Sequence, residues 1–147
     1  MKVTEAQLET WGERVGADIV TPVFFALSGD LGAGKSVLAR AIARGAGVSA
    51  AMPSPTFNLV FHYDGRDGTK VIHMDLYRIE RPEDVWALGW SELGEDREIV
   101  LVEWPERAGA LLPPDRWDIR LDYESAGLRT VTATQVGTVP PLPELSA

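Results

Sequence analysis

Residues 29–36 are the sequence feature that most constrains how this chain can fold. They read GDLGAGKS, which completes the pattern G-x-x-x-x-G-K-[ST] of phosphate-binding loops. The preceding residues 23–27 are apolar and of strand length, whereas residues 37–44 lack Gly and Pro and favour a helix. The pattern therefore lies between a predicted strand and a predicted helix, which is the context that such a loop requires.

The residue types in this loop suit the binding of a nucleotide. Glycines allow successive backbone N–H groups to point at phosphate oxygens, and the following helix adds the positive end of its dipole. We expect Lys35 to reach the β- and γ-phosphates, and the hydroxyl of Ser36 to bind Mg²⁺. Without a ligand, we expect Lys35 to face solvent. The alternative is a Gly-rich turn that only joins the strand to the helix.

Length and composition limit the possible functions. The 147 residues suit one domain, predicted over residues 1–137, and the proline-rich residues 138–147 read as a disordered tail. Lys and Arg total 14 against 22 for Asp and Glu, so a net charge of −8 disfavours binding of nucleic acid by this chain alone. The chain has no cysteine, and neither a signal peptide nor a membrane span is recognisable, so we expect a cytoplasmic protein without disulfides.

The remaining pattern predicts an α/β fold. Thr4 and Gln7 form a capping box that begins an amphipathic helix, which we expect to end near Gly16. Strand-like runs joined by turn residues predict two hairpins: residues 58–63 with 69–74, and residues 117–123 with 129–134. We therefore predict the fold of phosphate-loop NTPases, with a mostly parallel sheet, added antiparallel hairpins, and helices on both faces.

Asp75 follows the second strand of the first predicted hairpin. Phosphate-loop enzymes place a carboxylate that handles Mg²⁺ or water at the end of such a strand. The alternative for Asp75 is a helix cap or a turn residue. His73, two residues earlier, is predicted to be a packed, hydrogen-bonded side chain rather than a ligand.

Glu103 ends a nearly continuous apolar run over residues 98–102, which predicts a central parallel strand buried on both faces. A carboxylate at the tip of a buried strand needs a partner, and a metal ion, a bound water or Arg107 could each serve. Trp104 follows at the same strand end, where ligands of open α/β sheets bind.

Residues 54–57 read SPTF, between two predicted structured segments. Thr56 lies where a phosphate-loop protein can carry a switch segment that senses the γ-phosphate and Mg²⁺. The alternative is a rigid proline connector.

Four motifs together resemble the TsaE (YjeE) family, the ATPase subunit of bacterial tRNA threonylcarbamoyladenosine synthesis. They are GDLGAGKS at residues 29–36, SPTF at residues 54–57, HMDLYR at residues 73–78 and LVEWPE at residues 101–106. The resemblance covers roughly residues 4–134. It implies an Mg-ATPase that works with the subunits TsaB and TsaD, contacts tRNA only indirectly, and hydrolyses ATP slowly without its partners.

The resemblance also implies roles for individual residues. Ser36 and Glu103 would hold Mg²⁺, with Asp75 ordering the waters of the metal or assisting hydrolysis. The nucleotide would be bound by the following residues: Gly29, Asp30, Leu31, Gly32, Ala33, Gly34, Lys35, Ser36, Val37, Thr56, Trp104 and Arg129.

Two other functions remain open from the sequence. A small nucleoside or metabolite kinase would share the loop but needs a lid with several arginines, and the eleven arginines of this chain are scattered. A nucleotide-gated interaction module would not need hydrolysis. No arginine is an obvious finger for the transferred phosphate, although Arg78 and Arg107 lie near the motifs, and a partner could supply one.

Overall fold

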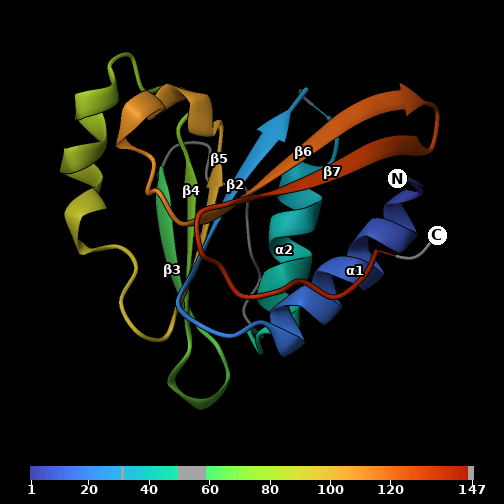
Figure 1. Cartoon of the computed structure of the whole chain (residues 1–147), viewed down its shortest axis with the longest axis horizontal. Helices are drawn as coiled ribbons and strands as arrows, with labels where there is room; N and C mark the ends of the chain where they lie inside the picture. Colours follow the sequence, from blue (N-terminus) through green and yellow to red (C-terminus); the bar gives the residue numbers. More distant parts are fainter. Residues whose placement is uncertain (31, 50–58, 146–147) are drawn as a thin grey trace.

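A seven-stranded mixed sheet forms the centre of the molecule (Figure 1). The computed structural model describes residues 1–30, 32–49 and 59–145. Its strands are β1 (Lys2–Val3), β2 (Val23–Gly29), β3 (Val60–Asp64), β4 (Lys70–Asp75), β5 (Glu98–Glu103), β6 (Arg116–Ser125) and β7 (Leu128–Val136). Their order across the sheet is β1-β7-β6-β2-β5-β4-β3. The four strands from β6 to β4 are parallel, and the predicted hairpins β3–β4 and β6–β7 are confirmed as antiparallel pairs.

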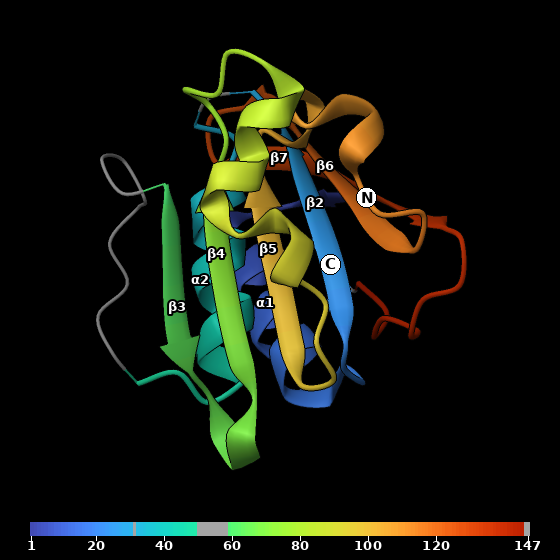
Figure 2. The same cartoon turned by 90° about the vertical axis from the view of Figure 1, so that its left-hand side faces the viewer.

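Two α-helices, α1 (Glu5–Asp18) and α2 (Lys35–Gly45), cover one face of the sheet (Figure 2). The opposite face is covered by short 3₁₀ segments: η2 (Pro82–Leu88), η3 (Trp90–Glu92), η4 (Pro105–Arg107) and η5 (Gly109–Leu111). A further 3₁₀ turn, η1 (Arg66–Gly68), joins β3 to β4. The prediction of helices on both faces is therefore confirmed, with both α-helices on the same side. No helix in the described part of the chain combines the length and apolar character of a membrane span.

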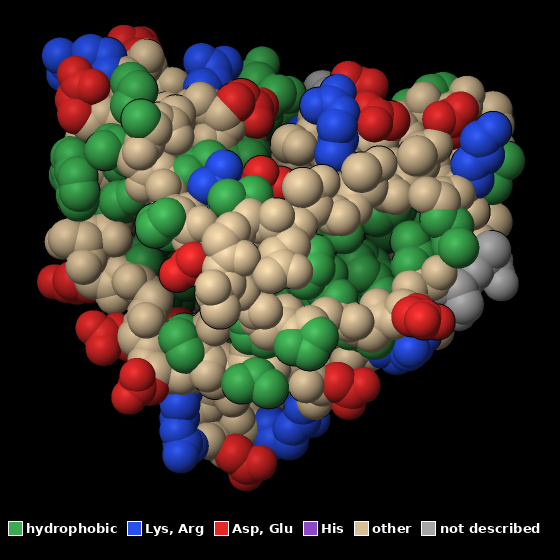
Figure 3. Space-filling model, in the orientation of Figure 1, with side chains coloured by type: hydrophobic (Ala, Val, Ile, Leu, Met, Phe, Trp, Pro, Cys, Tyr) green, Lys and Arg blue, Asp and Glu red, His purple; other side chains and the backbone are tan. Residues whose placement is uncertain are grey.

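The C-terminal segment differs from the predicted disordered tail. Residues 138–145 extend from β7 back across α1, where Trp11 and Trp117 donate hydrogen bonds to backbone carbonyls of the segment. They border an apolar hollow beside the β6–β7 hairpin (Figure 3). The proline content by itself indicates disorder, but the partners of the segment lie on elements that are distant in sequence.

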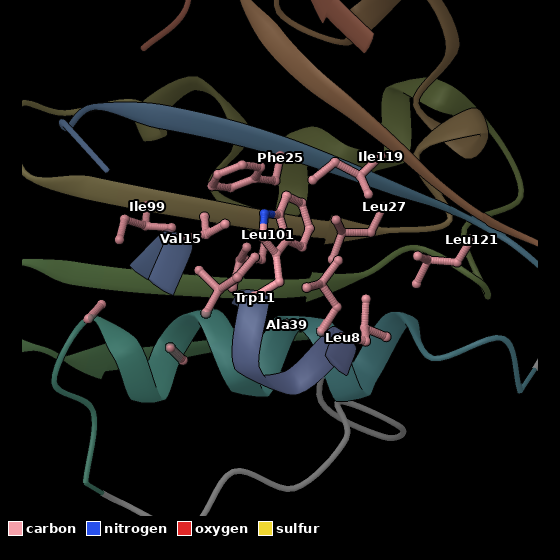
Figure 4. Close-up of a cluster of buried hydrophobic side chains, with 14 of the residues drawn as sticks. Leu8, Trp11, Val15, Phe25, Leu27, Ala39, Ile99, Leu101, Ile119 and Leu121 are labelled. Carbon is pink, nitrogen blue, oxygen red and sulfur yellow. The ribbon is translucent and has the colours of Figure 1, made fainter. Parts of the chain in front are cut away.

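The core explains why residues 23–27 of β2 and residues 99–102 of β5 are apolar. Alternate residues of β2 face opposite sides, so Phe25 and Leu27 pack toward the α-helices, whereas Phe24 and Ala26 pack toward the 3₁₀ segments. Figure 4 shows the first of these clusters, in which side chains of α1 and α2 meet the sheet. Burial on both faces confirms the central parallel strand predicted from residues 98–102.

The helices α1 and α2 approach each other closely because glycines lie at their contact. The predicted capping box of Thr4 and Gln7 begins α1. Further along this helix, a Cβ atom added to Gly16 would lie 1.9 Å from the carbonyl oxygen of Ile42 in α2. A Cβ atom added to Gly45 would lie 2.0 Å from the carbonyl oxygen of Glu13. The backbones of the two helices are therefore nearly in contact.

Gly16→Ala tests this packing. Helix propensity alone predicts that Ala stabilises α1 by about 1 kcal/mol. The clash with the α2 backbone predicts the opposite sign, a loss of roughly 1–3 kcal/mol in the free energy of unfolding. Denaturant unfolding decides between these values, with Thr10→Ala on the exposed side of α1 as the control. Stabilisation by Gly16→Ala would show that the backbones of α1 and α2 lie further apart than in this structure.

Candidate functional site

The loop between β2 and α2 curls through backbone conformations that favour glycine. Gly29 and Gly34 have φ values of 131° and 109°. A Cβ atom on Gly29 would lie 1.9 Å from the carbonyl oxygen of Leu121 in β6, so only glycine fits there. Gly34 is the N-cap of α2, directly before its first residue. Of the predicted loop residues, Leu31 lies outside the described part of the chain.

Lys35 is buried, which corrects the expectation that it faces solvent. Its Nζ donates to the carbonyl oxygen of Gly29 at 2.6 Å and lies 3.7 Å from the ring centroid of Trp104. Burial lowers the pKa of Lys35, and the nearby carboxylates, Glu103 first among them, act against this shift. The ammonium group thus has a carbonyl and an aromatic face as its direct partners, and no carboxylate of the described residues forms an ion pair with it.

Glu103 lies at the end of β5 with 3 % of its surface exposed. The hydroxyl of Ser36, in the first turn of α2, donates to its carboxylate and lies 3.0 Å and 3.1 Å from the two oxygens. His73 Nε2 is 2.6 Å from Oε2 of the same carboxylate. Ser36 and His73 therefore provide the partners that the sequence required, whereas Arg107 lies over the ring of Tyr77 at 5.9 Å.

The prediction that His73 is a packed, hydrogen-bonded side chain is confirmed, whereas its partner, Glu103, was not predicted. The side chain is fully buried on β4, two residues before Asp75, so the two residues face the same side of the strand. Because the carboxylate of Glu103 only accepts hydrogen bonds, Nε2 carries the proton of this bond. Nδ1 is buried without a hydrogen-bond partner among the described residues. The His-x-Asp spacing indicates that His73 and Asp75 belong to one site, because residues two positions apart on a strand face the same side.

Asp75 lies beside Glu103, its partner in the parallel register of β4 and β5. Its Oδ1 accepts a hydrogen bond from the backbone N–H of Tyr77 at 2.9 Å, so the predicted turn role is present. Burial raises the pKa of Asp75, and the negative charge of Glu103 adds to this shift. The hydrogen bond from Tyr77 acts in the opposite direction.

Trp104 and Arg129 complete the surroundings of the loop. Trp104 has a left-handed backbone conformation, with φ 58° and ψ 49°, directly after Glu103. Its ring centroid is 5.0 Å from that of Tyr77. On the other side, a Cβ atom added to Gly34 would lie 3.0 Å from a guanidinium nitrogen of Arg129. The Nε of Arg129 is buried without a hydrogen-bond partner in the described part of the chain.

The structure thus brings most of the predicted site residues to one edge of the sheet. At or around this edge lie the described members of the loop, Val37 in the first turn of α2, Asp75, Glu103, Trp104 and Arg129. Thr56 lies outside the described residues. Within the described ranges, no three His, Cys, Asp or Glu side chains are grouped to hold a metal ion. The assignment of individual residues to ATP or Mg²⁺ stays a prediction.

The fold and this edge define an α/β protein in which a phosphate-binding-loop sequence connects a central strand to a helix. A sequence model described as threonylcarbamoyl adenosine biosynthesis protein TsaE matches residues 3–131. The chain belongs to the TsaE family.

Similarity to individual proteins supports this family membership. The tRNA threonylcarbamoyladenosine biosynthesis protein TsaE of Haemophilus influenzae is 34% identical over 113 residues, which are 76% of this chain and 71% of the relative. The protein of the same name from Treponema pallidum is 34% identical over 122 residues, 83% of this chain and 89% of the relative. A crystal structure of Bacillus subtilis YdiB matches with a TM-score of 0.76 and 28% identity, covering 93% of this chain and 86% of that one.

The raised pKa of Asp75 predicts a stability effect of Asp75→Asn. Asn keeps the oxygen that accepts from Tyr77 N–H and removes a charge that burial disfavours, so the variant should be more stable near neutral pH by less than about 1 kcal/mol. Because the folded-state pKa is raised, the wild-type protein gains stability as the pH falls through it, and the difference should shrink in acid.

Thermal unfolding at several pH values measures this difference, and Asp96→Asn, at an exposed position, controls for the substitution itself. A variant that is less stable than the wild-type protein at neutral pH would contradict the account of Asp75.

Proposed function

We propose that this protein is an Mg²⁺-dependent ATP hydrolase that acts in tRNA threonylcarbamoyladenosine biosynthesis. The observation that carries the proposal is the buried carboxylate of Glu103, hydrogen-bonded to Ser36 of the phosphate-binding-loop sequence. The pathway comes from the names of the relatives, which describe biosynthesis proteins for this tRNA modification.

The loop offers suitable groups for the phosphates of ATP. Glycines at positions 29 and 34 let the backbone approach the ligand, and Lys35 carries a positive charge at the start of α2. The direct partners of Lys35 are a neutral carbonyl and an aromatic ring, both of which a phosphate oxygen can replace. Arg129 lies against Gly34, and its buried Nε has no hydrogen-bond partner among the residues that the structure describes, so a second cation is available at the loop.

Ser36 and Glu103 are the residues that fit Mg²⁺. Hydroxyl and carboxylate oxygens are the ligands this ion prefers, and it takes its remaining ligands from phosphates and water, so a cluster of three acidic side chains is not needed. When bound, the ion would neutralise charge on the phosphates. His73 would keep the carboxylate of Glu103 in place through the hydrogen bond from Nε2.

Asp75 is our candidate for the residue that orients the attacking water. Its partly buried carboxylate lies at the end of β4 next to Glu103, and its raised pKa makes it a better proton acceptor than an ordinary aspartate. The hydrogen bond from Tyr77 occupies Oδ1, which leaves Oδ2 for a water molecule. Glu103 is already held by Ser36 and His73, so we assign the water-orienting role to Asp75.

We further propose that hydrolysis serves a complex with TsaB and TsaD. The chain is acidic, with a net charge of −8, so a tRNA backbone would be repelled unless another protein provided the contact. A partner that adds positive charge at the transferred phosphate would accelerate hydrolysis. Contact with tRNA would then be indirect.

Lys35→Met and Glu103→Gln separate nucleotide binding from metal binding. Lys35→Met should lower the affinity for ATP at least about tenfold with or without Mg²⁺, since hydrogen bonds to charged groups contribute roughly 1.5–3 kcal/mol. Glu103→Gln should lower affinity only when Mg²⁺ is present. Titration calorimetry in Mg²⁺ and in EDTA measures both effects, and circular dichroism checks the folds. Unchanged ATP affinity in Lys35→Met would reject the loop as the nucleotide site.

Release of inorganic phosphate tests the partnership. ATP hydrolysis should be slow for the isolated chain and at least about tenfold faster with TsaB and TsaD, whereas tRNA alone should not stimulate it. Asp75→Asn should still bind ATP and the partners but should lose the stimulation. Phosphate transfer to a small acceptor without partners would favour the kinase alternative instead.

A further inference from the structure

Two tryptophans on different elements hold the C-terminal segment by its backbone. Trp11 of α1 donates from Nε1 to the carbonyl oxygen of Pro143 at 2.9 Å. Trp117 of β6 donates from Nε1 to the carbonyl oxygen of Pro140 at 2.7 Å. The two carbonyls are three residues apart, which is one turn of a polyproline II helix.

The burial of the segment follows the same period of three. Thr138, Pro141 and Glu144 are exposed, whereas the residues between them, and Leu145, are half-buried. A β-strand would alternate every second residue, so the pattern is that of a polyproline II segment with one of its three edges facing solvent. Leu142 and Leu145 pack against the cluster formed by the α-helices and the sheet.

The surface that receives the segment is an apolar groove. A hollow of about 260 Å³ beside the segment is lined by Trp11, Trp117, Val131 and Ala133, together with Leu142 and Leu145 of the segment itself (Figure 3). An apolar, tryptophan-lined groove with indole N–H donors spaced for one polyproline turn is the arrangement by which proteins bind proline-rich peptides. Residues 139–145 belong to no helix or strand. They are held by these contacts and by a hydrogen bond from Arg14 Nη1 to the carbonyl oxygen of Glu144.

We propose that this groove is a binding site for a proline-rich extended segment, that residues 139–145 are its exchangeable ligand, and that its occupancy strengthens nucleotide binding at the loop. The second effect rests on the proposed ATP site. The binding of the segment itself does not.

The connection to the loop runs through α1. Trp11 lies one helical turn after Leu8, and a Cβ atom added to Gly34 would lie 3.0 Å from Cδ2 of Leu8. By bonding both Trp11 and Trp117, the segment ties α1 to β6, which is paired with the strand β7 that carries Arg129. Loss of the segment removes this tie, and Leu8 and Arg129 then hold the loop less tightly.

The test uses the full-length chain with its own ligand weakened by three substitutions, Pro140→Ser, Leu142→Ser and Pro143→Ser. A synthetic peptide of residues 137–147 with the natural sequence is then added. NMR signals of the indole N–H groups of Trp11 and Trp117 should shift in the triple variant and return when the peptide binds. A peptide carrying the three serines is the control. The wild-type chain should not take up the natural peptide at the same concentration, because its own segment competes at an effective concentration of roughly millimolar.

Substitution of Trp by Phe separates the indole hydrogen bonds from the packing of the aromatic rings. In the triple variant, adding Trp11→Phe and Trp117→Phe should weaken binding of the peptide at least about fivefold, since each removes one hydrogen bond while keeping the aromatic ring. Trp86→Phe, at an exposed tryptophan outside the groove, should leave binding unchanged. Failure of the natural peptide to bind the triple variant, or equal binding of the serine peptide, would contradict the proposal that the groove binds this segment.

Nucleotide affinity completes the experiment. The triple variant should bind ATP at least about fivefold more weakly than the wild-type chain, and the natural peptide should restore the affinity. Equal ATP affinity with and without a bound segment would contradict the proposed coupling between the groove and the loop, but not the proposal that the groove binds the segment. Absence of ATP binding by the wild-type chain would reject both the proposed function and the coupling. Peptide binding to the triple variant would still test whether the groove binds a proline-rich segment.

Discussion

A buried carboxylate organises the functional edge of this protein. Glu103 is almost completely removed from solvent, and a charge in that position is tolerated only when hydrogen bonds replace water. Ser36 and His73 supply these bonds, so α2, β5 and β4 must meet at one point. The parallel order β2-β5-β4 makes this possible, because it places the carboxyl ends of the strands, and the loop that follows β2, at the same edge.

Elements with local signals were predictable from the sequence. The apolar run before Glu103 requires burial on both faces, and the turn residues between alternating runs specify the two hairpins. The capping box of Thr4 and Gln7 is likewise a local interaction. The loop pattern located the candidate site because its residue types and spacing are themselves local. In each case the physical cause acts within a few residues of the chain.

Features that depend on strand order were not predictable. The burial of Lys35 results from Trp104, which reaches the loop only because β5 lies beside β2. The pairing of His73 with Glu103 needs β4 as the next neighbour. The C-terminal segment is held by Trp11 and Trp117, far away in the chain, and its proline-rich composition alone does not distinguish a docked polyproline segment from a disordered one.

The two sides of the loop are built by different kinds of contact. Glu103 and His73 stand on β5 and β4 of the central sheet, and Ser36 stands on α2, which packs against that sheet. The sheet is buried on both faces and cannot shift without breaking the core. On the other side of the loop lie Leu8 of α1 and Arg129 of β7. Both elements contact an end of the chain: β1 pairs with β7, and the C-terminal segment crosses α1. The residues suited to metal chemistry therefore stand on the least deformable part of the fold. Under the proposed function, any adjustment of nucleotide affinity is expected on the opposite side, where contacts made by the ends of the chain can be exchanged without unfolding the sheet.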